Sequence, residues 1–97
     1  MKAIEIVSQE IQTAKDKYGP FNSTHELYGV LAEEVHEFFQ VMMWKNYDPN
    51  LFDGKAKKEL QESLDMKKRN MIHELSQIAA VALRGIDELQ HNEIKWV

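Results

Sequence analysis

Four polar side chains fall on helix faces that the sequence otherwise makes apolar. Each residue of an α-helix advances about 100° around the axis. In one predicted helix Glu34 projects into the apolar arc and Glu37 lies at its edge. In a later predicted helix Glu74 projects into the apolar arc and Gln77 lies at the same edge, one turn on. Each helix therefore presents a polar pair, spaced i and i+3, on or beside its packing face.

This placement indicates a site for a divalent cation. A carboxylate that leaves water is costly unless it is paired with a charge or bound to a metal. Converging carboxylates also raise one another's pKa values unless a cation neutralises them. Oxygen ligands suit Mg²⁺ or Mn²⁺, and Mg²⁺ commonly completes its shell with waters and substrate phosphates. The alternative is that Lys45, Arg69 or Arg84 forms salt bridges with these acids.

The elements that position these residues are all predicted to be helices, in a single domain over residues 1–97. No segment alternates apolar and polar residues in the manner of a strand. We expect a first helix over 1–18, a second over 23–45, a loop over 46–54, a short helix over 55–65 and a long helix over 67–90. The fold class is therefore all-α: about four helices in an antiparallel bundle.

The boundaries come from capping and turn signals. Ser23 and Glu26 have the spacing of a capping box at the start of the second helix. The first helix ends before Gly19-Pro20, because a residue that precedes proline avoids the helical region. A continuous helix after Gly54 would span about 50 Å, so we expect a break within 63–68. The tail over 91–97 is expected to fray.

Taken together, the polar pairs resemble the motifs of the MazG-like all-α nucleoside triphosphate pyrophosphohydrolases. The segment 33–37, EEVHE, matches the EExxE pattern of that group, and the segment 74–77, ELSQ, resembles the ExxD pattern that follows it. Trp44 and Lys45 resemble the helix end of the dCTP pyrophosphatase branch. The resemblance extends from Leu27 to Leu89.

The resemblance implies an enzyme that cleaves a nucleoside or deoxynucleoside triphosphate into the monophosphate and pyrophosphate. It implies Mg²⁺, with Mn²⁺ as the alternative ion, and a homodimer or homotetramer with sites between helices. The implied roles fall into three groups: metal ligands Glu34, Glu37, Glu74 and Gln77; catalytic acids Glu33 and Glu37; substrate contacts Trp44, Lys45 and Arg84. Trp44 would stack on the base, and Glu33 or Glu37 would accept a proton from the attacking water.

One departure from the pattern opens alternatives. Gln77 stands where the group has Asp, which removes one negative charge and is expected to weaken metal binding. The chain is then alternatively a catalytically weakened relative that binds nucleotide or a protein partner, or a purely structural helical protein. A di-iron site built on the Glu33-x-x-His36 spacing is disfavoured, because His36 projects away from the apolar face.

Composition restricts the class of protein further. The chain has 12 Lys and Arg against 16 Asp and Glu, a net charge of −4, which argues against a nucleic-acid partner. It has no cysteine, so thiolate metal sites are excluded. No apolar run is long enough to span a bilayer. We expect a cytoplasmic protein with no membrane partner. A chain of 97 residues also leaves much of its surface uncovered, which favours a site completed by a second copy.

Overall fold

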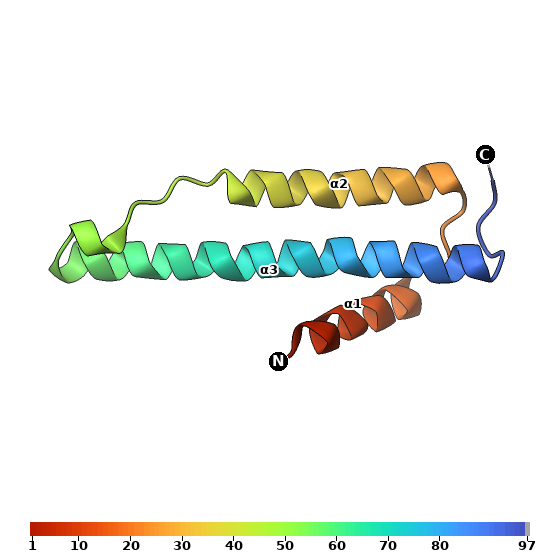
Figure 1. Ribbon diagram of the computed structural model, residues 1–97, viewed down its shortest axis with the longest axis horizontal. Helices are drawn as coiled ribbons and strands as arrows, with labels where there is room; N and C mark the ends of the chain where they lie inside the picture. Colours follow the sequence, from red (N-terminus) through yellow and green to blue (C-terminus); the bar gives the residue numbers. More distant parts are fainter. Residues whose placement is uncertain (97) are drawn as a thin grey trace.

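The computed structural model describes residues 1–96 and consists of three α-helices and one short 3₁₀-helix (Figure 1). The elements are α1 (Ala3–Lys17), α2 (Thr24–Met42), η1 (Pro49–Leu51) and α3 (Gly54–Gln90). Among the described residues there is no β-strand, although Ser23 and Lys95 form an isolated bridge. The all-α prediction is confirmed. Val97, the last residue of the predicted domain, lies outside the described residues.

The helix starts and ends follow local sequence signals. The Ser23 side chain caps α2 by accepting a hydrogen bond from the backbone N–H of Glu26 at 3.1 Å, as the capping box predicts. α1 ends at Lys17, shortly before Gly19-Pro20. The Asp48 side chain caps η1 by accepting from the N–H of Asn50. The short-range signals therefore located the end of α1 and the start of α2 to within a few residues, whereas η1 lies within the predicted loop over 46–54.

The predicted break within 63–68 is wrong, because α3 runs without interruption for 37 residues. The structure therefore has three α-helices and not four. Between Gly54 and Gly85 the segment contains neither proline nor glycine, so nothing local stops the helix. The prediction assumed a compact chain, for which the radius of gyration would be about 12.5 Å. The observed radius of gyration is 17.4 Å and the long axis is 57 Å.

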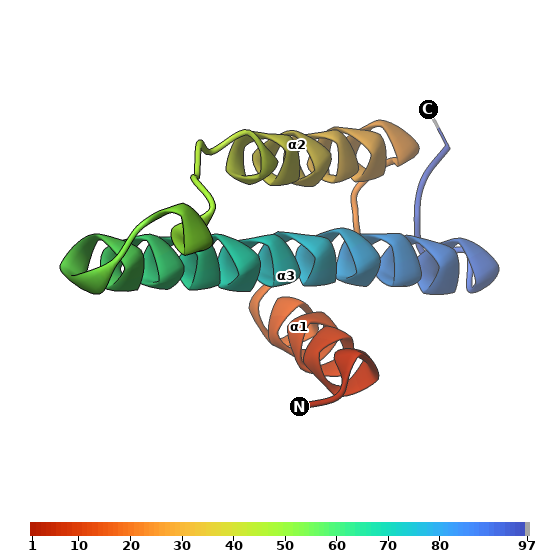
Figure 2. The same ribbon diagram turned by 60° about the vertical axis from the view of Figure 1, so that its left-hand side comes forward.

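α3 is the central element of the molecule. α2 lies along one side of it and α1 along another, as two views show (Figures 1 and 2). The buried apolar core is small and lies toward the C-terminal end of α3, where Phe21, Val81 and Ile94 pack together. The tail was predicted to fray. Instead Ile94 is buried, and the Lys95 carbonyl accepts a hydrogen bond from Thr24 N–H at 3.1 Å.

Gly85 lets α2 approach α3 closely. A Cβ atom at this position would lie 2.9 Å from both Cδ atoms of Leu27. The contact lies between the first turn of α2 and the C-terminal half of α3.

The predicted apolar faces are only partly covered within one chain. On α2, Val35 and Met42 remain 48% and 40% exposed, and on α3, Leu75 and Ile86 remain 49% and 54% exposed. The reason is that only α3 packs against α2 among the described elements, so the rest of the α2 surface stays open. None of the helices in the described chain is long and apolar enough to span a membrane.

Candidate metal centre and adjoining cavity

Three acids from two helices converge at the α2–α3 contact. Glu34 and Glu37 come from α2, and Glu74 comes from the middle of α3. Each offers a carboxylate oxygen within 4.8 Å of the others, and all three residues are half-buried. We call Glu34, Glu37 and Glu74 the acid cluster. The sequence predicted that these three side chains would share a packing face, and the structure brings them together.

The acid cluster is not neutralised by the protein. The Oε2 atoms of Glu34 and Glu74 are buried and have no hydrogen-bond partner among the residues that the structure describes. Within residues 1–96, no Lys or Arg nitrogen lies within 4.0 Å of the three carboxylates. The salt bridges considered as the alternative are therefore absent from the described chain.

The consequence is electrostatic strain. Burial, followed by the charges of Glu37 and Glu74, raises the pKa of Glu34 to about 7. Burial and the charge of Glu37 also raise the pKa of Glu74, and His73 opposes this in part. At neutral pH the folded chain therefore holds these acids only at a cost, which a bound cation would remove.

The residues fit a hard divalent cation. The three side chains supply only oxygen donors, and two buried oxygens lack any other partner. Mg²⁺ and Mn²⁺ prefer oxygen ligands and often keep several waters. Three carboxylates from two helices therefore have the composition that such an ion needs.

A cavity of about 320 Å³ adjoins the acid cluster. Glu34 contributes to its wall, together with residues of α1, α3 and the segment that joins α1 to α2. Its volume is at the lower limit of the range typical of small-molecule sites. The cavity is therefore large enough to hold part of a ligand whose charged end reaches Glu34.

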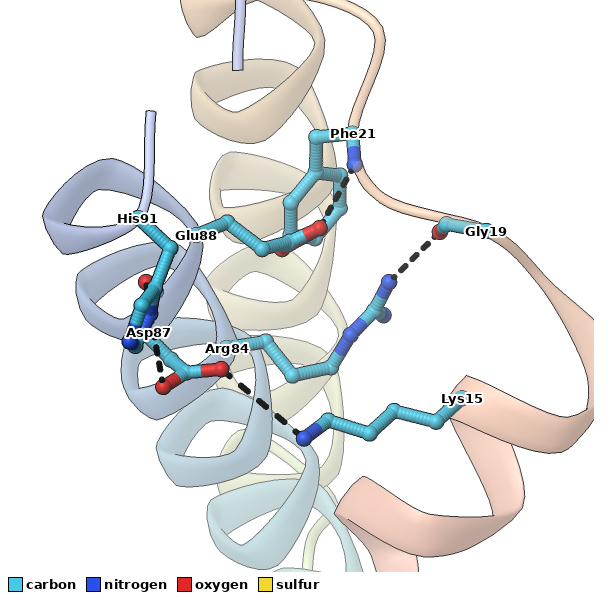
Figure 3. Close-up of polar contacts among 7 residues, drawn as sticks. All are labelled: Lys15, Gly19, Phe21, Arg84, Asp87, Glu88 and His91. Carbon is cyan, nitrogen blue, oxygen red and sulfur yellow. Dashed lines mark hydrogen bonds and ion pairs between the residues drawn. The ribbon is translucent and has the colours of Figure 1, made fainter. Parts of the chain in front are cut away.

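Arg84 is the basic residue of this cavity. It is 7% exposed, its guanidinium lies 4.4 Å from the centre of the Phe21 ring, and one nitrogen donates to the Gly19 carbonyl at 3.2 Å (Figure 3). In the part of the chain that the structure describes, no carboxylate oxygen lies within 4.0 Å of it. A guanidinium has five N–H donors, so Arg84 retains donors for an anionic ligand.

Gln77 is engaged with α1. Its Nε2 donates a hydrogen bond to Glu10 Oε2 at 2.6 Å, and both residues contribute to the cavity wall beside Glu34. Gln77 was predicted as the fourth metal ligand. The structure gives its amide nitrogen a carboxylate partner from a helix that the sequence analysis had not connected with the site.

The remaining predicted site residues lie outside this cavity. Glu33 is exposed, one position before the cluster acid Glu34, and its charge contributes to the raised pKa of that acid. Trp44 and Lys45 follow the end of α2 and are exposed, and the Trp44 carbonyl accepts from Lys67 Nζ at 2.8 Å. Neither Trp44 nor Lys45 lines the cavity.

Glu10 was not among the predicted site residues. The signal was present, because Glu10 lies three residues after Val7 and four before Ala14, at the edge of the apolar stripe of the first helix. The same argument that singled out Glu37 applies to it. What the pattern did not contain was the direction from which α1 approaches α3.

A second group of possible metal ligands lies at the end of α3. Asp87, His91 and Glu93 each offer an atom within 4.8 Å of the others. This group is more exposed than the acid cluster, and Asp87 already contacts Lys15 and His91 (Figure 3).

Comparison with known proteins found no match: the chain matches no family profile, no curated protein and no solved structure.

Proposed function

We propose that the protein is a Mg²⁺-dependent nucleotide pyrophosphohydrolase of the MazG-like all-α type. The observation that carries the proposal is the acid cluster: Glu34, Glu37 and Glu74 meet within 4.8 Å without a cationic partner in the described chain. The substrate would be an NTP or dNTP, and the products would be the monophosphate and pyrophosphate. The resemblance of segments 33–37 and 74–77 to the EExxE and ExxD motifs supports this reaction.

The residues around the cluster have the chemistry that the reaction needs. A divalent ion, when bound, neutralises charge on phosphate oxygens and lowers the pKa of a bound water. Glu37, or the exposed Glu33 beside the cluster, accepts the proton of the attacking water. Arg84 faces the same cavity as Glu34, so its free N–H groups are available to a phosphate group.

Trp44 and Lys45 are proposed as substrate contacts on the other side of the cluster. Trp44 follows Glu37 by seven residues and lies two residues beyond the end of α2. Its side chain is 47% exposed and is free to stack on a base. The triphosphate would then lie between the Arg84 side of the cluster and the Trp44 side.

We also propose that the active form is a homodimer or homotetramer. The support is the arrangement of exposed apolar residues on α2, which follow a 4- and 3-residue spacing: Tyr28, Ala32, Val35, Phe39 and Met42. Such a stripe is typical of a helix that packs on another helix. A contiguous exposed apolar stripe commonly marks an interaction surface. The small core of the single chain also favours burial of this stripe against another copy.

The second candidate is a chain that binds nucleotide without hydrolysing it. Gln77 favours this candidate, because it carries no charge and its amide is already bonded to Glu10. The two proposals share the cation and the nucleotide and differ only in whether pyrophosphate is released.

The test is a panel of NTPs and dNTPs with Mg²⁺ or Mn²⁺, with pyrophosphate release as the measurement. We expect turnover of at least one nucleotide, and a loss of about 100-fold or more in Glu34→Ala and Glu37→Ala, since each removes charge stabilisation at the reacting phosphates. Asp87→Ala is the matched control, because it removes an acid from the other ligand group, and it should retain activity. If no nucleotide is turned over but binding is retained, the second candidate replaces the first.

A further inference from the structure

We infer that Glu10 is the fourth acid of the cation site, supplied by α1 and held in place by Gln77. The inference rests on the cation site of the proposed function. The observation that supports it is the 2.6 Å hydrogen bond from Gln77 Nε2 to Glu10 Oε2. Both residues line the cavity that Glu34 also lines. It assigns a role to Glu10, which the motif resemblance does not include, and a positioning role to Gln77 in place of the role of metal ligand.

The side chain at position 77 changes the charge of the site. An acid at position 77 would have given the site four carboxylates, and Gln77 leaves three on α2 and α3. Glu10 lies 67 residues earlier in the sequence, yet its carboxylate reaches the side chain of residue 77. The negative charge missing from α3 is therefore present beside it, on a different helix.

The geometry indicates that Glu10 acts through water. Glu10 is not one of the acids whose oxygens lie within 4.8 Å of one another. We therefore do not expect Glu10 to coordinate the ion directly together with the three acids of the cluster. Mg²⁺ usually keeps several of its waters. A carboxylate beyond the first ligands accepts hydrogen bonds from those waters, and such outer partners tune metal affinity.

Gln77 is the positioning residue of the pair. Its amide nitrogen is bonded to one oxygen of Glu10, which fixes the orientation of that carboxylate. An Asp at position 77 would face Glu10 with a like charge. An amide on α3 therefore suits an acid on α1, because the amide donates a hydrogen bond where an Asp would repel the carboxylate of Glu10. Gln77 then acts by positioning Glu10 and not as a metal ligand.

The experiment is a titration with Mn²⁺ alone, without nucleotide. Binding is measured by calorimetry or from the paramagnetic signal of free Mn²⁺. We expect Glu10→Gln to weaken Mn²⁺ binding about 10-fold, the lower end of the effect of removing an outer partner. The exchanged variant, Glu10→Gln with Gln77→Glu, restores both the charge and the hydrogen bond. It should return the affinity to within about 3-fold of the starting protein. Glu5→Gln, an exposed acid on the same helix, is the matched control and should leave binding unchanged.

Glu10→Gln also separates this role from a merely structural one. Glutamine keeps an acceptor for the Gln77 amide, so the melting temperature without metal should change little. Unchanged Mn²⁺ affinity in Glu10→Gln, or failure of the exchanged variant to restore it, overturns the inference and leaves the proposed enzyme intact. If Glu10→Gln weakens Mn²⁺ binding and the exchanged variant restores it, but the protein hydrolyses no nucleotide, the inference is supported and the proposed enzymatic activity is rejected. Absence of Mn²⁺ binding in the starting protein overturns both.

Discussion

Two groups of side chains among residues 1–96 have the composition of a metal site, and they differ in what surrounds them. The acid cluster lies between two helices, half-buried, and two of its oxygens have no partner. The C-terminal group, Asp87, His91 and Glu93, lies at the exposed end of α3. In both groups the ligand atoms lie within 4.8 Å of one another, so proximity alone does not separate them.

Two of the three members of the C-terminal group, Asp87 and His91, already have partners within the protein. Asp87 lies 3.8 Å from Lys15 Nζ and 3.4 Å from His91 Nδ1, and that same ring nitrogen is 2.7 Å from the Asp87 carbonyl (Figure 3). Water reaches these groups, so their charges cost little. A buried carboxylate without a partner is costly, and of these two groups only the acid cluster has such carboxylate oxygens among residues 1–96.

The strongest test of this difference is stabilisation by Mg²⁺. Free Mg²⁺ at a concentration of 100 times its dissociation constant should raise the free energy of unfolding by about 2.7 kcal/mol. For a domain of this size that is a rise in melting temperature of roughly 10–20 °C. We expect the rise in the starting protein and in Asp87→Asn, and its loss in Glu34→Gln. The reverse pattern, with loss only in Asp87→Asn, would assign the ion to the C-terminal group.

The second test is the pH dependence of stability without metal. The pKa of Glu34 is raised from 4.5 to about 7 in the folded chain, so the proton is held more tightly when the chain is folded. This stabilisation is complete below about pH 4.5 and is lost as the pH rises through about 7. In EDTA the melting temperature should therefore fall from pH 5 to pH 8, and Glu34→Gln should flatten the fall. Mg²⁺ binding competes with the same proton and should weaken as the pH is lowered below 7.

The third test concerns a buried acid that is structural. Glu88 is 6% exposed and its Oε1 accepts the backbone N–H of Phe21 at 2.8 Å (Figure 3). Glu88→Ala should leave that N–H unpaired and cost about 1–3 kcal/mol in urea unfolding. Mn²⁺ affinity should be unchanged. A large drop in affinity would mean that the end of α3 takes part in the cation site.

The smallest effect is expected at the surface ion pair. Lys15 and Asp87 are 53% and 47% exposed in their side chains and lie 3.8 Å apart. Exposed pairs contribute about 0–1 kcal/mol, so Lys15→Ala should change the free energy of unfolding by no more than that. A greater loss, measured by urea unfolding at moderate salt, would show that α1 depends on this contact for its position.

Much of the fold was accessible from local signals. Ser23 and Glu26 located the start of α2, and the periodicity of α2 and α3 placed Glu34, Glu37 and Glu74 on facing surfaces. These features depend on residues within a few positions of one another, so they can be read from the chain directly. The continuous α3 was missed because its prediction relied on an assumed compact shape, whereas no residue within 63–68 opposes a helix.

The sequence by itself determined that the protein is helical and that at least three acids share the packing faces of two helices. Helical periodicity is a local property, and it fixes which side chains share a face. The tertiary structure decided that those acids meet with no Lys or Arg side chain paired to them in residues 1–96, that Glu10 reaches Gln77 from α1, and that Arg84 faces the same cavity as Glu34. The physical reason is that such contacts depend on the angle and register between helices, which are set by close approaches such as that of Leu27 to Gly85.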